Sequence, residues 1–312
     1  MRTHWLVRVS AAVILAAGTV AAHAEERITI GTGGTGGLFY VIGAGVAQVI
    51  NKHMKDATAR AEVTGASIEN IRRVSAGQET MGFSSSSTLY EAKNGLKPFK
   101  QKQPVAAIAY LYPAVLQLAV LADSKYKSIA DLKGATISIG PPGSNSAVLA
   151  QRLLTAYGVF DKNHVRFLSY TEGAKALENG TVDATCVLAG APTAALIDLS
   201  TQRNTRFLSL DPSKVQGMMK KYKFYQIAEI PAGTYKGQDK PVKVINDPAI
   251  LFTSAKAPKQ LVYNITKAIF SNLDDIHAIH KQAKHIKLST AEKTPIAIHP
   301  GALEYYQQVK KD

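Results

Sequence analysis

The sequence of 312 residues predicts an α/β protein built from two similar lobes that close on each other like a clamshell. Two observations support this fold class. Short apolar strands alternate with helices along most of the chain, which is typical of sheets with helices packed on their faces. Each half also opens with a strand, a loop rich in glycine or proline and a helix, at residues 28–40 (ITIGTGGTGGLFY) and 137–149 (ISIGPPGSNSAVL). A ligand is expected between the lobes, where strands end and helices begin.

The first half of the chain supplies most of one lobe. Strands are predicted at residues 27–30, 59–63 and 81–84, and helices at residues 38–53, 68–76 and 88–95. Residues 105–121 are apolar, but Pro113 interrupts them. Because proline breaks a helix interior, this stretch is predicted to form a strand, a turn and a second strand.

The second half repeats the alternation, in what we expect to be a parallel-rich sheet. Strands are predicted at residues 136–139, 165–168, 183–188 and 207–210, with a helical turn at 131–134 and helices at 147–157, 172–179 and 192–199. A strand at 249–254 and a helix at 258–272 follow. We therefore expect a discontinuous first lobe (residues 25–115 plus 246–312) and a second lobe (residues 116–245), with crossings near 113–117 and 245–249.

The composition excludes several classes of protein. Apolar residues make up 46% of the chain and charged residues 19%, so a sizeable core can form and disorder is not expected. The single cysteine, Cys186, excludes an intrachain disulfide and a cysteine-based metal cluster. It lies in an apolar strand, where it is expected to be a small buried hydrophobe.

The first 24 residues match a secretory signal peptide. Arg2 and Arg8 precede an apolar run at residues 9–22, and Ala22-His23-Ala24 is a typical cleavage site. The alternative is a membrane anchor, but the run is short for a span of ~30 Å and no basic stop-transfer block follows it. We expect cleavage after Ala24 and a periplasmic protein.

A periplasmic location changes how the net positive charge of the chain is interpreted. Lys and Arg outnumber Asp and Glu by 37 to 23, and the net charge of +14 falls to +12 without Arg2 and Arg8. A basic domain can bind nucleic acid. Here the basic residues are scattered, without an interleaved aromatic stripe, so no nucleic-acid partner is expected. They indicate a solvated surface that helps to attract an anionic ligand.

The glycine loop at residues 31–36 has three interpretations. It fits G-x-G-x-x-G between a strand and a helix, the pattern of a dinucleotide site. That site needs an acidic residue ending the second strand, whereas Asp56 lies before this strand and Glu62 inside it. The loop can also be a plain tight turn. We favour a third interpretation, in which free backbone N–H groups and the positive helix end bind a small carboxylate or phosphate.

Other strand-to-helix loops are rich in hydroxyl groups. Ser67 begins the helix that carries Asn70, residues 84–88 contain four serines and a threonine, and Ser144-Asn145-Ser146 opens the matching helix of the second lobe. Pro192 lies at a favoured first-turn position. Some of these side chains are equally explained as helix caps.

In six segments the sequence resembles the TAXI-type solute-binding proteins, the receptors of tripartite ATP-independent periplasmic (TRAP) transporters. The segments are residues 30–40 (IGTGGTGGLFY), 64–78 (TGASIENIRRVSAGQ), 128–146 (SIADLKGATISIGPPGSNS), 180–193 (GTVDATCVLAGAPT), 232–239 (AGTYKGQD) and 299–306 (HPGALEYY). The resemblance implies a two-lobed type II periplasmic-binding fold without catalysis or cofactor. It also implies that a small carboxylate is delivered to a membrane permease driven by an ion gradient.

The resemblance also implies which residues contact the ligand. Matching positions in the family's four ligand loops are Gly33, Thr35, Gly36 and Tyr40, then Ser67 and Asn70, then Ser144, Asn145 and Ser146, and lastly Pro192 and Thr193. The serine run adds Ser85 and Ser87.

Two departures from the family pattern concern the ligand. Where the family usually has Gln-x-Asp this chain has Ser85-Ser86-Ser87, and the glutamate that commonly follows Pro113 is absent. Since serine offers no charge to an amino group, we expect a mono- or dicarboxylate without an ammonium group.

No constellation in the sequence favours an enzyme or a metal site. The chain has no G-x-S-x-G elbow and no P-loop lysine. His277 and His280 could ligate a metal, but interleaved lysines favour a solvated helix face. The alternatives to a TRAP receptor are a receptor for an ABC importer or a sensor kinase and, less favoured, an exported nucleotide-dependent enzyme.

Overall fold

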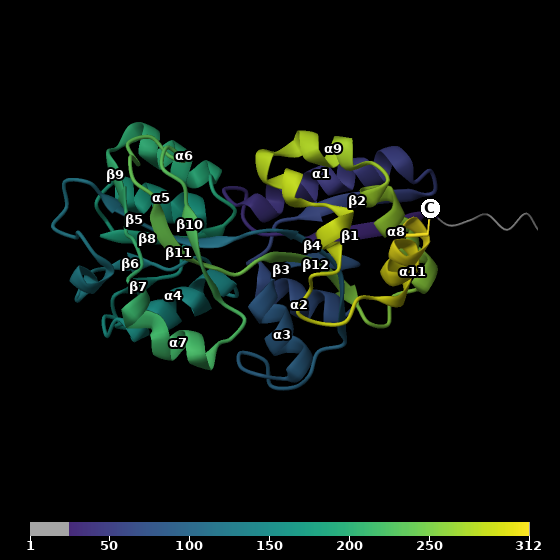
Figure 1. The fold of residues 1–312 in the computed structure, drawn as a ribbon, viewed down its shortest axis with the longest axis horizontal. Helices are drawn as coiled ribbons and strands as arrows, with labels where there is room; N and C mark the ends of the chain where they lie inside the picture. The colour runs from purple at the N-terminus through teal and green to yellow at the C-terminus, as the bar shows by residue number, and fades with distance from the viewer. Residues whose placement is uncertain (1–24, 312) are drawn as a thin grey trace, which may run out of the picture.

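A computed structural model describes residues 25–311, which form two lobes, each a sheet covered by helices (Figure 1). The expected signal peptide and its cleavage site lie outside the described residues, apart from Glu25, which follows that site. The two-lobed α/β fold predicted from the sequence is confirmed.

The first lobe is built on a sheet of five strands in the order β2-β1-β3-β12-β4. Its strands are β1 (Glu26–Gly31), β2 (Ala57–Glu62), β3 (Met81–Ser85), β4 (Val105–Tyr112) and β12 (Ala249–Ser254). Its helices are α1 (Leu38–His53), α2 (Ser67–Ser75), α3 (Ser86–Asn94), α8 (Lys259–Phe270), α9 (Leu273–Ile279), α10 (Leu288–Ala291) and α11 (Pro300–Val309), with the short η3 (Lys281–His285). In Figure 1, α1 and α9 lie on one side of this sheet and α2 and α3 on the other.

The second lobe is built on a sheet in the order β10-β11-β5-β8-β6-β7, with β9 beside β5. Its strands are β5 (Val115–Leu121), β6 (Ile137–Ser138), β7 (Val165–Arg166), β8 (Ala184–Ala189), β9 (Thr205–Phe207), β10 (Gln226–Ile230) and β11 (Val242–Asn246). Its helices are α4 (Asn145–Ala156), α5 (Tyr170–Glu178), α6 (Ala194–Gln202) and α7 (Gln216–Lys221), with the short η1 (Ile129–Leu132) and η2 (Pro212–Val215).

The chain crosses between the sheets twice, from β4 to β5 and from β11 to β12. Both crossings are short, and the Asp247 N–H of one donates to the Ala114 carbonyl of the other at 2.8 Å, so they lie side by side as a hinge. The expectation of a parallel-rich sheet is wrong, because both sheets are mixed. The strands β5 and β12 enter from the hinge and pair antiparallel with β8 and β3, whereas β1, β2 and β3, like β6, β7 and β8, pair parallel within their lobes.

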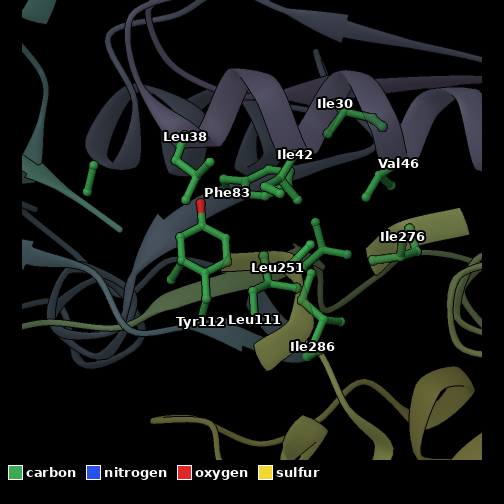
Figure 2. Close-up of a cluster of buried hydrophobic side chains, with 14 of the residues drawn as sticks. Ile30, Leu38, Ile42, Val46, Phe83, Leu111, Tyr112, Leu251, Ile276 and Ile286 are labelled. Carbon is green, nitrogen blue, oxygen red and sulfur yellow. The ribbon is translucent and has the colours of Figure 1, made fainter. Parts of the chain in front are cut away.

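A continuous core stabilises the base of the first lobe (Figure 2). The apolar side chains of α1 at Leu38, Ile42 and Val46 are spaced at four residues, so they share one helix face. This face packs over Phe83 of β3 and Leu251 of β12, and all five side chains are almost fully buried. The core therefore holds the glycine loop that precedes α1 in a defined place. Within residues 25–311, no helix is long and apolar enough to cross a membrane.

Candidate functional site

An enclosed cavity of about 140 Å³ lies between the two lobes. From the first lobe it is lined by Gly33, Gly34, Gly37, Leu38, Phe39, Val63, Thr64, Ala66, Ser67 and Ser85. From the second lobe it is lined by Pro141, Ser144, Asn145, Ser146, Ser169, Tyr170, Leu188 and Ala189. These residues follow β1, β2, β6 and β7 or end β3 and β8, so the wall is made at the carboxyl ends of strands. Ligands of open α/β sheets bind at such ends.

The lobes contact each other directly around this cavity. The backbone N–H groups of Ile68 and Glu69, at the start of α2, donate to the Gly143 carbonyl of the second lobe at 3.0 and 3.4 Å. At Gly36, a Cβ atom would lie 2.3 Å from Oγ1 of Thr171 in α5. Glycine is therefore required there by the close approach of the lobes. The structure shows a closed arrangement.

The cavity wall carries no charged side chain, counting all described residues that line it. Its electrostatic bias comes from the backbone. The 16-residue helix α1 begins at the wall after Gly37, and no side chain caps it. The first N–H groups of a helix lack intrahelical partners, and the helix dipole adds positive potential there. The wall therefore favours a small anion without offering a salt bridge.

Hydroxyl groups supply the polar contacts of the wall. Ser67 in α2 accepts a hydrogen bond from the backbone N–H of Ser85 at 3.0 Å. Ser144 is used as a helix cap, since its Oγ accepts from the Ala147 N–H and donates to the Pro141 carbonyl. The Oγ of Ser146 is buried and makes no hydrogen bond within the described protein. Ser146 therefore differs from Ser67 and Ser144, and its side chain lies next to the Tyr170 hydroxyl.

Aromatic and aliphatic groups form the rest of the wall. The Tyr170 hydroxyl donates to the Leu188 carbonyl at 2.9 Å. Burial raises the pKa of Tyr170 to about 12, so the ring forms a neutral wall. Phe39 and Val63 add apolar surface from the first lobe. The arrangement fits a small solute with one anionic end and a short carbon skeleton.

Six of the residues expected at the site line the cavity: Gly33, Ser67, Ser85, Ser144, Asn145 and Ser146. The other seven lie outside its wall: Thr35, Gly36, Tyr40, Asn70, Ser87, Pro192 and Thr193.

Protein groups occupy three of the polar side chains among those seven, those of Asn70, Ser87 and Thr193. Asn70 donates to the carbonyls of Gly31, Thr32 and Phe83 at 2.7–3.0 Å, and its Oδ1 accepts from Thr64, so it ties the glycine loop to β3. The backbone N–H of Thr193 donates to the Tyr235 hydroxyl at 3.0 Å. Ser87 is bound to Asp247. Thr35 is exposed, Tyr40 is half-buried, and Pro192 is buried at the start of α6.

Sequence reasoning did not single out Phe39, Ser169, Tyr170 or the end of β8. Tyr170 follows a strand and begins a helix, the same junction that identified Ser67 and Ser144. The signal was present in the strand–helix alternation, but Tyr170 lacks the glycine and hydroxyl composition that drew attention to the other loops.

Two buried polar clusters cross between the lobes beside the cavity. In one, Asp247 of the hinge binds Ser87 at the start of α3 and Asn145 at the start of α4. In the other, Arg152 of α4 forms an ion pair with Glu91 of α3 at 2.6 Å, with side chains only 13% and 4% exposed. Burial raises the pKa of Glu91, although the Arg152 charge opposes this. Both clusters hold the lobes in the closed arrangement.

Other hollows differ from this cavity. A groove of about 980 Å³ lies between Lys97–Lys100 and the helices α4 and α7, open to solvent. This cavity is the better candidate because it is more enclosed than the groove and collects strand ends and a helix N-terminus. Among residues 25–311, no three or more His, Cys, Asp or Glu side chains are grouped to hold a metal. His277 hydrogen-bonds the Ile286 carbonyl at 2.9 Å. Cys186 is buried in β8, as expected.

Comparison with known proteins identifies the fold and the family. Residues 30–309 match the NMT1-like family. The structure is similar to MatC from Rhodopseudomonas palustris with bound malate (TM-score 0.58, 14% identity, 91% of this chain and 98% of that one). It is also similar to a binding protein component of an ABC phosphonate transporter from Pseudomonas aeruginosa, with a TM-score of 0.56 and 14% identity over 84% of this chain and 80% of that one. A third similar structure is that of the periplasmic aliphatic sulphonate binding protein SsuA from Escherichia coli, with a TM-score of 0.50 and 15% identity over 90% of this chain and 83% of that one.

Proposed function

We propose that this chain, which belongs to the NMT1-like family, is a periplasmic solute-binding receptor that captures a small organic anion between its two lobes. The observation that carries the proposal is the cavity, which joins a helix N-terminus and several serine side chains at the interface of the lobes. Ligand contacts from both lobes stabilise the closed form at the expense of an open one, so binding shifts the population towards closure. No step in this mechanism needs catalysis or a cofactor. The lobes we propose for this receptor are residues 25–115 plus 246–312, and 116–245, with Val115 and Asn246 at the boundary pairing in the second sheet.

The chemistry of the wall supports a mono- or dicarboxylate without an ammonium group as the ligand. Backbone N–H groups at the start of α1 and the Ser146 hydroxyl can donate to a carboxylate. A buried ammonium group needs a carboxylate or several acceptors. The wall has no acidic side chain, and Ser85-Ser86-Ser87 stands where the resembling family has Gln-x-Asp.

The ligand assignment is tested by calorimetry on the protein from Glu25 onward. The titrants are succinate, propionate and 2-oxoglutarate, with glutamate, glutamine, NAD and FAD as comparisons. Saturable binding of a carboxylate, with a smaller radius of gyration in X-ray scattering on binding, supports a closing receptor. Much tighter binding of glutamate or glutamine than of 2-oxoglutarate contradicts the absence of an ammonium group. Stabilisation by a nucleotide alone overturns the receptor function.

The partner we propose is the membrane permease of a TRAP transporter, following the resemblance to TAXI-type receptors. Receptors of ABC importers share the fold, and one such component is among the similar structures. A receptor for an ABC importer or a sensor kinase is therefore the second candidate. Capture of the purified, ligand-loaded protein by TRAP permease subunits, and not by an ABC permease, distinguishes the two.

Export follows from residues 1–24 and the signal peptide that their sequence predicts. Mass spectrometry of the protein from the periplasmic fraction should give an N-terminus at Glu25. An exported nucleotide enzyme fits the structure poorly. The cavity of about 140 Å³ is small for a dinucleotide, and among the described residues of its wall no acidic side chain could bind a ribose.

A further inference from the structure

A groove on the surface, which we call the interlobe groove, is separate from the cavity between the lobes. It has a volume of about 980 Å³, opens to solvent and shares no lining residue with the cavity. One wall is residues 97–100, which follow α3 of the first lobe, and the other is formed by α4, α7 and Tyr222 of the second lobe. In Figure 1, α3 and α7 lie on the same side of the molecule. Because each lobe supplies one wall, the groove is complete only when the lobes are closed.

Apolar side chains form much of the lining of the interlobe groove. Phe99 comes from the first lobe, and Met218 and Tyr222 come from the second. The Tyr222 ring is held on one face by the Arg152 guanidinium, whose carbon atom lies 4.0 Å from the ring centroid. Arg152 in turn is paired with Glu91 of the first lobe. Apolar surface that is gathered in one hollow and rimmed by polar groups is typical of an interaction site.

The charged residues that line the groove are all basic: Lys97, Lys100, Lys221 and Arg152. Within residues 25–311, no acidic side chain forms an ion pair with any of the three lysines, and all three are exposed. The rim therefore carries three positive charges that the protein itself does not compensate. A second copy of this chain, docked by the same face, would place these lysines against each other, and like charges at an interface repel.

We propose that the interlobe groove is a docking site for an acidic segment of the membrane permease. In this complex an aromatic or aliphatic side chain of the permease enters the groove, and flanking Asp or Glu side chains pair with Lys97, Lys100 and Lys221. The inference rests on the proposed function, because the partner is the transporter that receives the solute. An anionic membrane would supply negative charge but no side chain that fills an apolar groove, so a protein segment is the better fit.

Docking at this groove is coupled to solute binding in the cavity. Both favour the closed arrangement, in which Glu91 reaches Arg152 and the two walls of the groove stand together. Two ligands that favour the same state raise each other's affinity by the same factor. A permease segment that docks here therefore selects the loaded receptor over the empty one.

Docking is tested with a labelled random copolymer of glutamate and tyrosine, which combines acidic and aromatic side chains. Polyglutamate, which offers charge alone, is the comparison. Binding to the protein from Glu25 onward is measured by fluorescence anisotropy at low ionic strength and at about 1 M salt, where charges are screened beyond about 3 Å. The copolymer should bind more tightly than polyglutamate and should lose affinity in salt. Equal binding of the two polymers overturns the apolar part of the site.

Two variants of equal net charge separate the groove from the general charge of the protein. The groove variant carries three substitutions, Lys97→Glu, Lys100→Glu and Lys221→Glu. The matched variant carries the same change at three exposed lysines that do not line the groove, Lys236, Lys240 and Lys256. The groove variant should raise the copolymer Kd at least about tenfold, and the matched variant less than about threefold. Equal losses would assign the binding to net charge and overturn the docking site.

Gly217→Trp tests the apolar part of the groove without changing its charge. Gly217 lines the groove, and a Cβ there has no atom within 4 Å, so a larger side chain has room to project into the groove. The copolymer Kd should rise at least about fivefold. Gln202→Trp, at an exposed position of α6, should leave the Kd unchanged. Unchanged or tighter binding by Gly217→Trp overturns the entry of a side chain into the groove.

The partner is tested by capture on purified TRAP permease subunits. The groove variant should lose capture and the matched variant should keep it, while calorimetry with succinate, propionate and 2-oxoglutarate gives the same Kd for both. Equal capture of the two variants, or no capture of the wild type, overturns the inference but leaves the receptor function. Binding to phosphatidylglycerol vesicles that needs the three groove lysines, without binding of the copolymer, assigns the groove to a membrane and also overturns it. Absence of carboxylate binding by the wild type overturns the receptor function itself.

Discussion

The substitution Asp247→Asn should change how the stability of the protein depends on pH. Asp247 is fully buried at the hinge, and burial raises its pKa from 3.8 to about 6. Hydrogen bonds from Ser87 and Asn145 and the charge of Arg152 oppose this shift without cancelling it. Glu91 and Tyr225 face the same buried charge and are retained in the variant.

The direction in which stability changes with pH follows from proton binding to Asp247 in the folded and unfolded chain. Between pH 4 and pH 6 the folded protein holds a proton on Asp247 that the unfolded chain has lost. The contribution of Asp247 to stability is therefore fully present below pH 4 and is lost as the pH rises through 6. A raised pKa of about two units corresponds to up to about 3 kcal/mol. Because an asparagine side chain cannot titrate, this component disappears in the variant.

The assay is urea unfolding of both proteins at several pH values from 4 to 7. Circular dichroism is the suitable probe, because the single tryptophan, Trp5, precedes the expected cleavage site. The stability of the wild type relative to the variant should fall by up to about 3 kcal/mol across this range. The amide introduced by the substitution cannot accept all the hydrogen bonds that the Asp247 carboxylate accepts. This lowers the free energy of unfolding of the variant by about 1–3 kcal/mol at every pH.

A parallel pair of pH profiles would refute the reasoning, since it would mean that Asp247 titrates alike in the folded and unfolded chain. Asp239→Asn, at an exposed position of the second lobe, controls for the general effect of removing one negative charge. If this control reproduces the pH-dependent change, the effect belongs to net charge and not to the buried hinge.

Three further substitutions test the closed arrangement and the cavity. Gly36→Ala should raise the ligand Kd at least tenfold in calorimetry, because its Cβ would hold the lobes apart, whereas Gly217→Ala has no atom within 4 Å and should bind normally; equal Kd values would contradict the close approach. Ser146→Ala should raise the ligand Kd about fivefold. The melting temperature of the ligand-free protein should stay the same or rise, because the hydroxyl that is removed is unpaired. A large fall in melting temperature would indicate a structural role. Glu91→Gln removes the ion-pair partner of the buried Arg152 and should destabilise the closed form by about 3–5 kcal/mol, seen as a larger radius of gyration by X-ray scattering. An unchanged radius would show that the pair does not hold the lobes together.

Much of the fold could be predicted because its signals are local. The strand, glycine loop and helix around α1 are one contiguous pattern, and Pro113 alone was enough to separate β4 from β5. Sequence reasoning missed β10, β11, α7 and the short helices after α8. β10 is largely exposed and forms through its antiparallel pairing with β11, so its sequence carries no alternation of apolar and polar residues.

The site was predicted less completely, because residue type does not determine the partner of a polar side chain. Ser67 and Ser87 are both serines near the start of a helix, but Ser67 lines the cavity and Ser87 binds Asp247. Asn70 and Asn145 are likewise both amides in α-helices. Three carbonyls surround Asn70, and they come together only when β1, β3 and α2 are assembled. Such long-range partners are visible in the structure and absent from the sequence.

The glycine loop shows how the closed structure explains a motif that sequence left open. The helix start at Gly37 agrees with an anion-binding role for the backbone N–H groups of α1. At Gly36 a different requirement applies, because Thr171 of the other lobe would meet any side chain. Gly65 is restricted in the same way, since its Cβ would lie 2.5 Å from the Pro142 carbonyl oxygen across the interface. Glycines of this kind are needed only when the lobes are closed. Their substitution should therefore reduce ligand affinity without destabilising either lobe, which distinguishes a moving receptor from a rigid two-lobed protein.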